Sequence, residues 1–131
     1  MSQRQILVDC KQHVSDLIVG YDVKYLDWDA AEIDKGVATA LFFFPNTGAG
    51  NSNVLLQQFD VRILCIKLNR MPAKLDVHDD ISSIVTRFRQ SSGLLSNVRY
   101  EILAEATGPF YTQNKHSVYA FCEIRVYTQG Y

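Results

Sequence analysis

The segment 37–44 constrains the fold of this chain more than any other. It contains a single polar residue, Thr39, and ends in three consecutive aromatic residues, Phe42, Phe43 and Phe44. Side chains on a strand point alternately to opposite faces of a sheet, so these three rings cannot all enter one core. At least one points away from the core, and that side must be covered by a helix or by another subunit.

The same question arises in the last predicted strand, residues 117–127. One of its two alternating sets of side chains is apolar throughout, and the other contains Tyr119, Phe121 and Tyr127. A small domain with apolar side chains on both faces of several strands leaves apolar surface for a partner. The sequence therefore predicts an oligomer.

Two segments have the apolar spacing of three and four residues that is typical of amphipathic helices. In the first, Ser2 is a plausible N-cap and Gly20 marks the end. In the second, Asp76 is the predicted cap and Gly93 marks the end. The apolar stripes are Ile6, Leu7, Cys10, Val14, Leu17 and Ile18 in the first helix, and Val77, Ile81, Ile84, Val85 and Phe88 in the second.

The remaining segments read as strands. Residues 21–26 form a short strand, and residues 37–44 and 54–68 form a hairpin with a long loop. Residues 98–106 and 117–127 form a second hairpin, joined by the turn-rich connection 107–116. This order predicts one α+β domain over residues 1–131, with an antiparallel sheet of about four to five strands and two helices packed on one face.

Composition excludes several classes of protein. The chain has 131 residues, 47% of them hydrophobic, and a net charge of −1, which excludes a largely disordered chain. No apolar run approaches the roughly 20 residues of a membrane helix, and the first residues do not form a signal peptide. We therefore expect a soluble, cytosolic protein, and we expect Cys10, Cys65 and Cys122 to be buried free thiols.

Motifs of known enzyme classes are not found in the sequence. The glycines at 48 and 50 do not complete a phosphate-binding loop, and no nucleophile elbow or metal-binding pair of histidines occurs. His13 and His78 are expected at the surface, where neighbouring aspartates would raise the pKa of each ring mildly. We predict no catalytic, cofactor-binding or metal-binding residues.

Charge is distributed unevenly along the chain. Residues 1–60 carry eight acidic and four basic residues, whereas residues 61–131 carry six acidic and nine basic residues. One interpretation is that these charges lie on solvated faces and loops. The other is a subunit whose opposite-sign patches meet head-to-tail in a ring. The candidate patch residues are Asp27, Asp29, Glu32 and Asp34 on the acidic side, and Arg62, Lys67, Arg70 and Lys74 on the basic side.

The order of segments resembles the tail terminator proteins of long-tailed bacteriophages. The resemblance includes the leading helix that ends near Gly20, the second hairpin arm with residues 57–66, and the helix 77–89 after a proline-containing crossover. It continues through residues 106–111 and the closing strand 121–127. It implies a non-enzymatic virion protein that caps the completed tail tube as a hexameric ring, stops tube polymerisation and provides the head–tail joining surface.

The resemblance also implies partners: further copies of the chain, the tail tube protein and a head-completion or neck protein. DNA would pass through the lumen of the ring without sequence-specific recognition, and no cofactor or membrane is implied. The protein would act in the host cytoplasm during assembly and stay at the head-proximal end of the tail. Alternatives are another neck, tail-completion or tail tube protein of similar fold, or a small α+β enzyme or ligand-binding domain.

One uncharged loop is a candidate contact with the tube or the neck. It carries two glycines and three asparagines, and functional loops of this kind often become ordered on docking. The alternative is an incidental hairpin loop. The candidate residues are Asn46, Thr47, Gly48, Ala49, Gly50, Asn51, Ser52 and Asn53.

Overall fold

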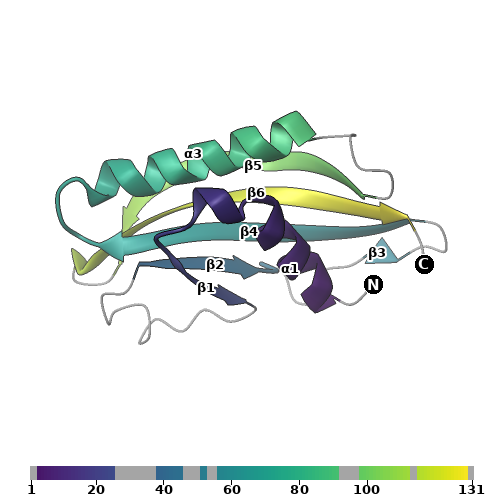
Figure 1. Ribbon diagram of the computed structural model, residues 1–131, viewed down its shortest axis with the longest axis horizontal. Coiled ribbons are helices and arrows are strands. Elements are labelled where there is room, and N and C mark those ends of the chain that lie inside the picture. The colour runs from purple at the N-terminus through teal and green to yellow at the C-terminus, as the bar shows by residue number, and fades with distance from the viewer. Residues whose placement is uncertain are drawn as a thin grey trace.

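The computed structural model describes residues 3–25, 38–45, 51–52, 56–91, 98–112 and 115–129 (Figure 1). In chain order the elements are α1 (Gln3–His13), the 3-10 turn η1 (Ser15–Leu17), β1 (Asp22–Tyr25), β2 (Thr39–Phe43), β3 (Asn51–Ser52), β4 (Leu56–Leu68), α3 (Ala73–Ser91), β5 (Val98–Tyr111) and β6 (Ser117–Gln129).

The strands form one sheet in the order β1-β2-β4-β6-β5, and the short β3 pairs with β4. Pairing is antiparallel throughout except between β1 and β2, which run parallel. The predicted α+β class is confirmed, but the sheet is mixed rather than wholly antiparallel. Residues 26–38 between β1 and β2 are long enough for the crossover that a parallel pair needs, about a dozen residues or more.

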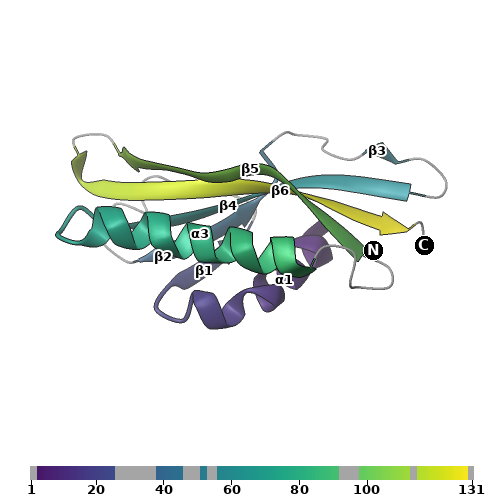
Figure 2. The ribbon, with the colours of Figure 1, turned by 90° about the horizontal axis from the view of Figure 1, so that it is seen from above.

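The core lies between one face of the sheet and the two helices, which Figure 2 shows on the same side of the strands. The predicted apolar stripes enter it, and only Leu17 stays partly exposed. The prediction that the first helix ends near Gly20 is wrong, because α1 ends at His13 and Leu17 lies in η1. They meet inward-facing residues of every long strand, including Phe42, Val61, Tyr100 and Ile124. We call the opposite side of the sheet the outer face.

All three cysteines lie in this core as free thiols, which confirms the prediction. Burial raises the pKa of each thiol, to about 12 in the case of Cys122. Because a thiol rather than a thiolate is present at neutral pH, these side chains act as small apolar groups.

Helix α1 is held against α3 through Arg87. Its guanidinium donates to both carboxylate oxygens of Asp16, at 2.9 and 2.8 Å, and to the His13 carbonyl at 3.0 Å. The hydrogen bond from Arg87 lowers the pKa of Asp16 to about 2. The last carbonyls of a helix lack partners within the helix, so Arg87 satisfies one of these groups at the end of α1.

Helix α3 begins earlier than the sequence suggests, so the prediction of Asp76 as its cap is wrong. The carbonyl of Pro72 accepts hydrogen bonds from the backbone N–H groups of Leu75 and Asp76, at 2.9 and 3.1 Å. Proline is favoured in the first turn, where its missing N–H costs nothing and its fixed φ already suits the helix. The helix therefore begins at Ala73.

Strand β5 is longer than predicted, because it extends through much of the expected connection 107–116. The sequence Gly108-Pro109 does not end the strand, since register shifts between Ile102 and Phe110 absorb the irregular residues. Gly108 has φ of +118°, a conformation that side chains rarely adopt. A Cβ placed there would lie 3.0 Å from the Tyr119 carbonyl oxygen and 3.1 Å from the Ala120 Cα.

Replacing Gly108 with alanine should therefore lower the free energy of unfolding by about 1–3 kcal/mol, because both the backbone conformation and the contact with β6 are strained. The matched control is Gly20→Ala, where no atom lies within 4 Å of the new Cβ. Urea denaturation of the two variants measures the difference. Equal midpoints for Gly108→Ala and Gly20→Ala would contradict this account of β5.

Candidate interaction surface

The outer face of the central strands β4 and β6 changes character along its length. Asp60 lies opposite Arg125, and Arg62 lies opposite Glu123. Further along the same two strands, Leu64 lies opposite Phe121 and Ile66 opposite Tyr119. Because alternate residues share a face, this face has a charged end and an apolar end.

The charged end is an ordered set of ion pairs. Arg125 Nε donates to Asp60 Oδ1 at 2.9 Å, and Arg62 Nε donates to Glu123 Oε1 at 2.9 Å. These four side chains are 20–34% exposed. The hydrogen bond to Asp60 is the main reason why the pKa of Arg125 is raised. Each such cross-strand pair contributes about 0.2–1 kcal/mol, so the set fixes side-chain positions more than it stabilises the fold.

Signs alternate in both directions across this charged end. Each strand carries one acidic and one basic residue on this face, and Glu101 of β5 lies beside Arg125. The Tyr127 hydroxyl donates a hydrogen bond to Glu101 Oε2 at 2.5 Å. A surface with this pattern offers fixed donors and acceptors to an opposing charged surface and rejects a mismatched one.

The apolar end contains Leu41, Leu64 and Ile66, all buried. Phe43, Tyr119 and Phe121 are only partly buried and pack against them. Phe110 of β5 continues this apolar end and is 40% exposed. Its ring centroid lies 5.5 Å from that of Tyr119 and 6.0 Å from that of Phe121. The outer face therefore holds a second apolar cluster outside the main core.

The structure separates the four residues of the predicted basic patch. Arg62 lies on the outer face, where it binds Glu123 and its guanidinium lies 4.7 Å from the centroid of the Phe121 ring. Lys67 lies on the helix side, with Nζ 3.8 Å from Asp76 and 3.9 Å from Asp80. Arg70 and Lys74 are exposed near the start of α3. The four basic residues are close in sequence but do not form one surface.

The predicted acidic patch, Asp27, Asp29, Glu32 and Asp34, lies outside the described residues. So does most of the predicted contact loop: Asn46, Thr47, Gly48, Ala49, Gly50 and Asn53. The two remaining loop residues form β3, in which Asn51 pairs with Gln58 and Ser52 with Gln57. In both views β3 lies at the same end of the molecule as the C-terminal end of β6 (Figures 1 and 2).

A group of titratable side chains lies on the helix side, around Tyr21. Its hydroxyl donates to Asp80 Oδ2 at 2.5 Å, and Lys67 Nζ lies 5.1 Å from the centroid of its ring. Burial is the largest cause of the raised pKa values of Tyr21 and of the neighbouring Cys65. Both groups stay protonated at neutral pH, so this network ties the segment before β1 to β4 and α3 instead of supplying a nucleophile.

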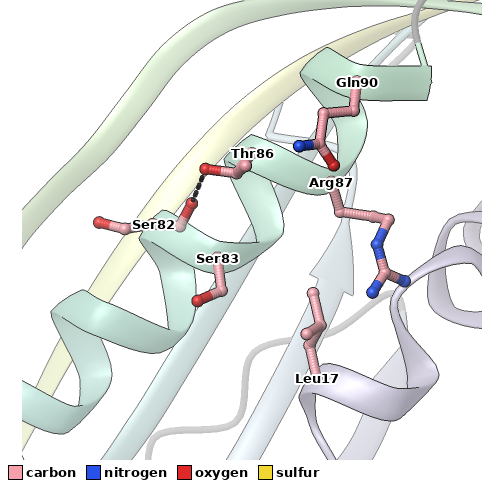
Figure 3. Close-up of a pocket in the computed structure, with 6 residues that line it drawn as sticks. All are labelled: Leu17, Ser82, Ser83, Thr86, Arg87 and Gln90. Carbon is pink, nitrogen blue, oxygen red and sulfur yellow. Dashed lines mark hydrogen bonds between the residues drawn. The ribbon is translucent and has the colours of Figure 1, made fainter.

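A groove of about 290 Å³ runs between α3 and η1 (Figure 3). Two of its hydroxyl groups bind the backbone of the helix: Thr86 donates to the Ser82 carbonyl at 3.0 Å and Ser83 to the Asp79 carbonyl at 3.1 Å. Arg87 at its edge is held by Asp16. Polar groups engaged in this way are not available to orient a ligand in the groove. Its lining residues are Leu17, Ser82, Ser83, Thr86, Arg87 and Gln90.

The described ranges contain neither a metal-binding cluster nor a membrane-spanning helix. No three His, Cys, Asp or Glu side chains within those ranges are grouped to hold a metal ion. No helix in the part of the chain with assigned structure has the length and apolarity to cross a membrane. The sequence matches no protein-family model and no curated protein.

His13 departs from its expected environment. Its ring lies 4.9 Å from Phe88 and 5.4 Å from Tyr100, measured between centroids. Desolvation, followed by the positive charge of Arg87, lowers the pKa of His13, whereas we expected a raised value. The prediction was wrong because the ring turns toward the core edge and away from the solvated acidic side of the helix.

The free energy of unfolding should consequently decrease as the pH is lowered through a window set by His13. The folded state binds a proton on this ring less readily than the unfolded chain does. The contribution of His13 is thus fully present above its ordinary pKa of 6.5 and is lost as the pH falls through the lowered folded-state value. Denaturation of the wild type and His13→Phe between pH 7.5 and 5 measures this. The variant should lose less stability on acidification, and parallel curves would contradict the assignment.

Proposed function

We propose that this chain is a tail terminator of a long-tailed bacteriophage. It caps the completed tail tube as a hexameric ring, stops further tube polymerisation and provides the surface on which the head is joined. The observation that carries the proposal is the character of the outer face, where an apolar cluster adjoins a set of ion pairs of alternating sign. An assembly subunit needs such a surface, whereas a catalytic domain does not.

Ring assembly fits this arrangement physically. Protein interfaces combine an apolar centre with a more polar rim, and the outer face offers both within one pair of strands. With the helices on the other side, the sheet can contact neighbours without disturbing the core. A ring is closed by one heterologous contact repeated around an axis, so one chain must present two different surfaces.

The elongated molecule gives the two sides of the ring different chemistry. One end carries β3, which belongs to the candidate contact loop 46–53. We assign this loop to the tail tube or to the head-completion protein, since an uncharged, glycine-rich loop can adapt to a docking surface. The protein would act at the head-proximal end of the virion tail, after assembly in the host cytoplasm, with DNA passing through the ring.

Deleting residues 48–52 should impair head–tail joining while folding and ring formation stay intact, because within the described residues this segment contributes only the β3 pairing to the fold. The variant would be supplied to phage that lack the protein, and infectious titre and unjoined heads and tails would be counted. The control is Lys11→Glu, which changes a half-buried surface residue of α1 far from the loop in sequence. Normal titre with the deletion variant would contradict the assignment of the loop.

A further inference from the structure

Exposed apolar side chains gather at the end of the molecule opposite β3. Six large apolar side chains of the described residues are exposed, and four of them come from the turn before α3, the first turn of α3 and the end of β5. Met71 is 96% exposed and Leu75 69%, with Phe110 and Tyr111 at 40% and 42%. Both ribbon views place the start of α3, the end of β5 and the start of β6 together (Figures 1 and 2).

Hydrogen bonds join the two turns at this end. The Asn69 backbone N–H donates to the His116 carbonyl at 3.0 Å, and Asn69 Nδ2 donates to the Lys115 carbonyl at 2.9 Å. Lys74 Nζ lies 5.2 Å from the centroid of the Tyr111 ring, and Lys115 Nζ lies 5.7 Å from it. We call this surface the basic cap. It consists of Arg70, Met71, Lys74, Leu75, Tyr111 and Lys115.

Positive charge dominates the basic cap. Arg70, Lys74 and Lys115 are all exposed. Two of the carboxylates in the following turns of α3, Asp76 and Asp80, lie within 4 Å of Lys67 on the helix side, and Asp79 is the third. This end of the molecule thus presents a nearly fully exposed methionine and an aromatic ring that two lysines approach. Such surface is unfavourable for an isolated subunit and suits an acidic partner that also carries apolar groups.

The chain itself contains a segment of this chemistry. Residues 27–34 carry four carboxylates, no lysine or arginine, and the apolar side chains Trp28 and Ile33. The segment connects β1 to β2 at one edge of the sheet, whereas Tyr111 belongs to β5 at the other edge. A contact between them in two copies would join opposite edges of the sheet, which is the heterologous kind of contact that a ring needs.

We infer that the basic cap is the docking site for residues 27–34 of a neighbouring copy of this chain. The inference rests on the proposed ring and specifies one part of the contact between neighbouring copies, in addition to the outer face. It retains Arg70 and Lys74 from the predicted basic patch and adds Lys115, which is distant in sequence. It leaves out Arg62 and Lys67, because both already bind carboxylates within their own subunit.

Exchange of charge between two variants tests the contact directly. The cap variant carries Arg70→Glu, Lys74→Glu and Lys115→Glu, and the segment variant carries Asp27→Lys, Asp29→Lys, Glu32→Lys and Asp34→Lys. In a ring made of one variant alone, the cap and the segment that face each other carry charges of the same sign. Each variant alone should therefore need at least a 10-fold higher concentration for half-maximal assembly. In an equimolar mixture the two charges are again opposite, and an even-numbered ring can alternate the variants. Light scattering should therefore show assembly restored in the mixture, to within about threefold of the wild-type concentration.

Two further variants separate the contact from effects on folding. Met71→Ser with Leu75→Ser removes exposed apolar groups without changing charge, so circular dichroism and the unfolding midpoint should stay unchanged while assembly weakens. Lys11→Glu reverses a charge on α1 and should assemble as the wild type does. An effect of Lys11→Glu as large as that of the cap variant would overturn the assignment, because it would indicate general electrostatic repulsion.

Other outcomes would overturn the inference as well. A wild type that stays monomeric at every concentration, a cap variant that assembles normally, or folded variants that fail to assemble when mixed would each do so. Normal rings of the cap variant that no longer attach to tails would assign the basic cap to the tube or neck protein instead. In that case the docking inference fails and the proposed function stands. Rings built through the cap that have no effect on tail assembly would instead contradict the proposed function.

Discussion

The pairing of β4 with β6 is the constraint on which the rest of the structure depends. All 13 residues of each strand take part without a register shift. Because side chains alternate, this unbroken register sends Val61, Ile63 and Cys65 into the core and places Asp60, Arg62 and Leu64 on the outer face. A shift by one residue would exchange the two sets, bury the charged residues and expose the core residues.

The two faces of this strand pair differ in what they contact. The inner face needs helices to cover it, and α1 and α3 provide that cover with regular stripes of apolar side chains. The outer face carries its own apolar cluster and its ion pairs, on the side of the sheet away from the helices. Surface of that kind suits contact with other proteins, which is the basis for proposing an assembly role.

The elements with the strongest periodicity could be predicted from sequence. The alternation in residues 117–127 is typical of a strand with one buried face, and the apolar spacing in residues 77–88 is typical of an amphipathic helix. Patterns of this kind predicted the main strands, the helices and the burial of the three thiols. The start of α3, the parallel pairing of β1 and the length of β5 could not be predicted. A proline such as Pro72 can lie in a loop or at the start of a helix, and a glycine such as Gly108 can lie in a turn or within an irregular strand. Tertiary contacts decide which of these forms.

The candidate surface was predicted only in part. The aromatic residues Phe43 and Phe121 on the second face of the strands signalled it, since no single core could contain both faces. The ion pairs could not be foreseen, because Asp60 and Arg125 are 65 residues apart and meet only through strand register. For the same reason the basic stretch 62–74 was treated as one patch, although its four residues point into three different surroundings.

The mass of the wild-type protein in solution tests the central claim most directly. Light scattering on a sizing column, over a series of protein concentrations, would be combined with electron microscopy of the same fractions. A terminator should form six-membered rings that appear as concentration rises and then grow no further. A monomer at all concentrations, a symmetric dimer, or stacks that lengthen into tubes would contradict the account.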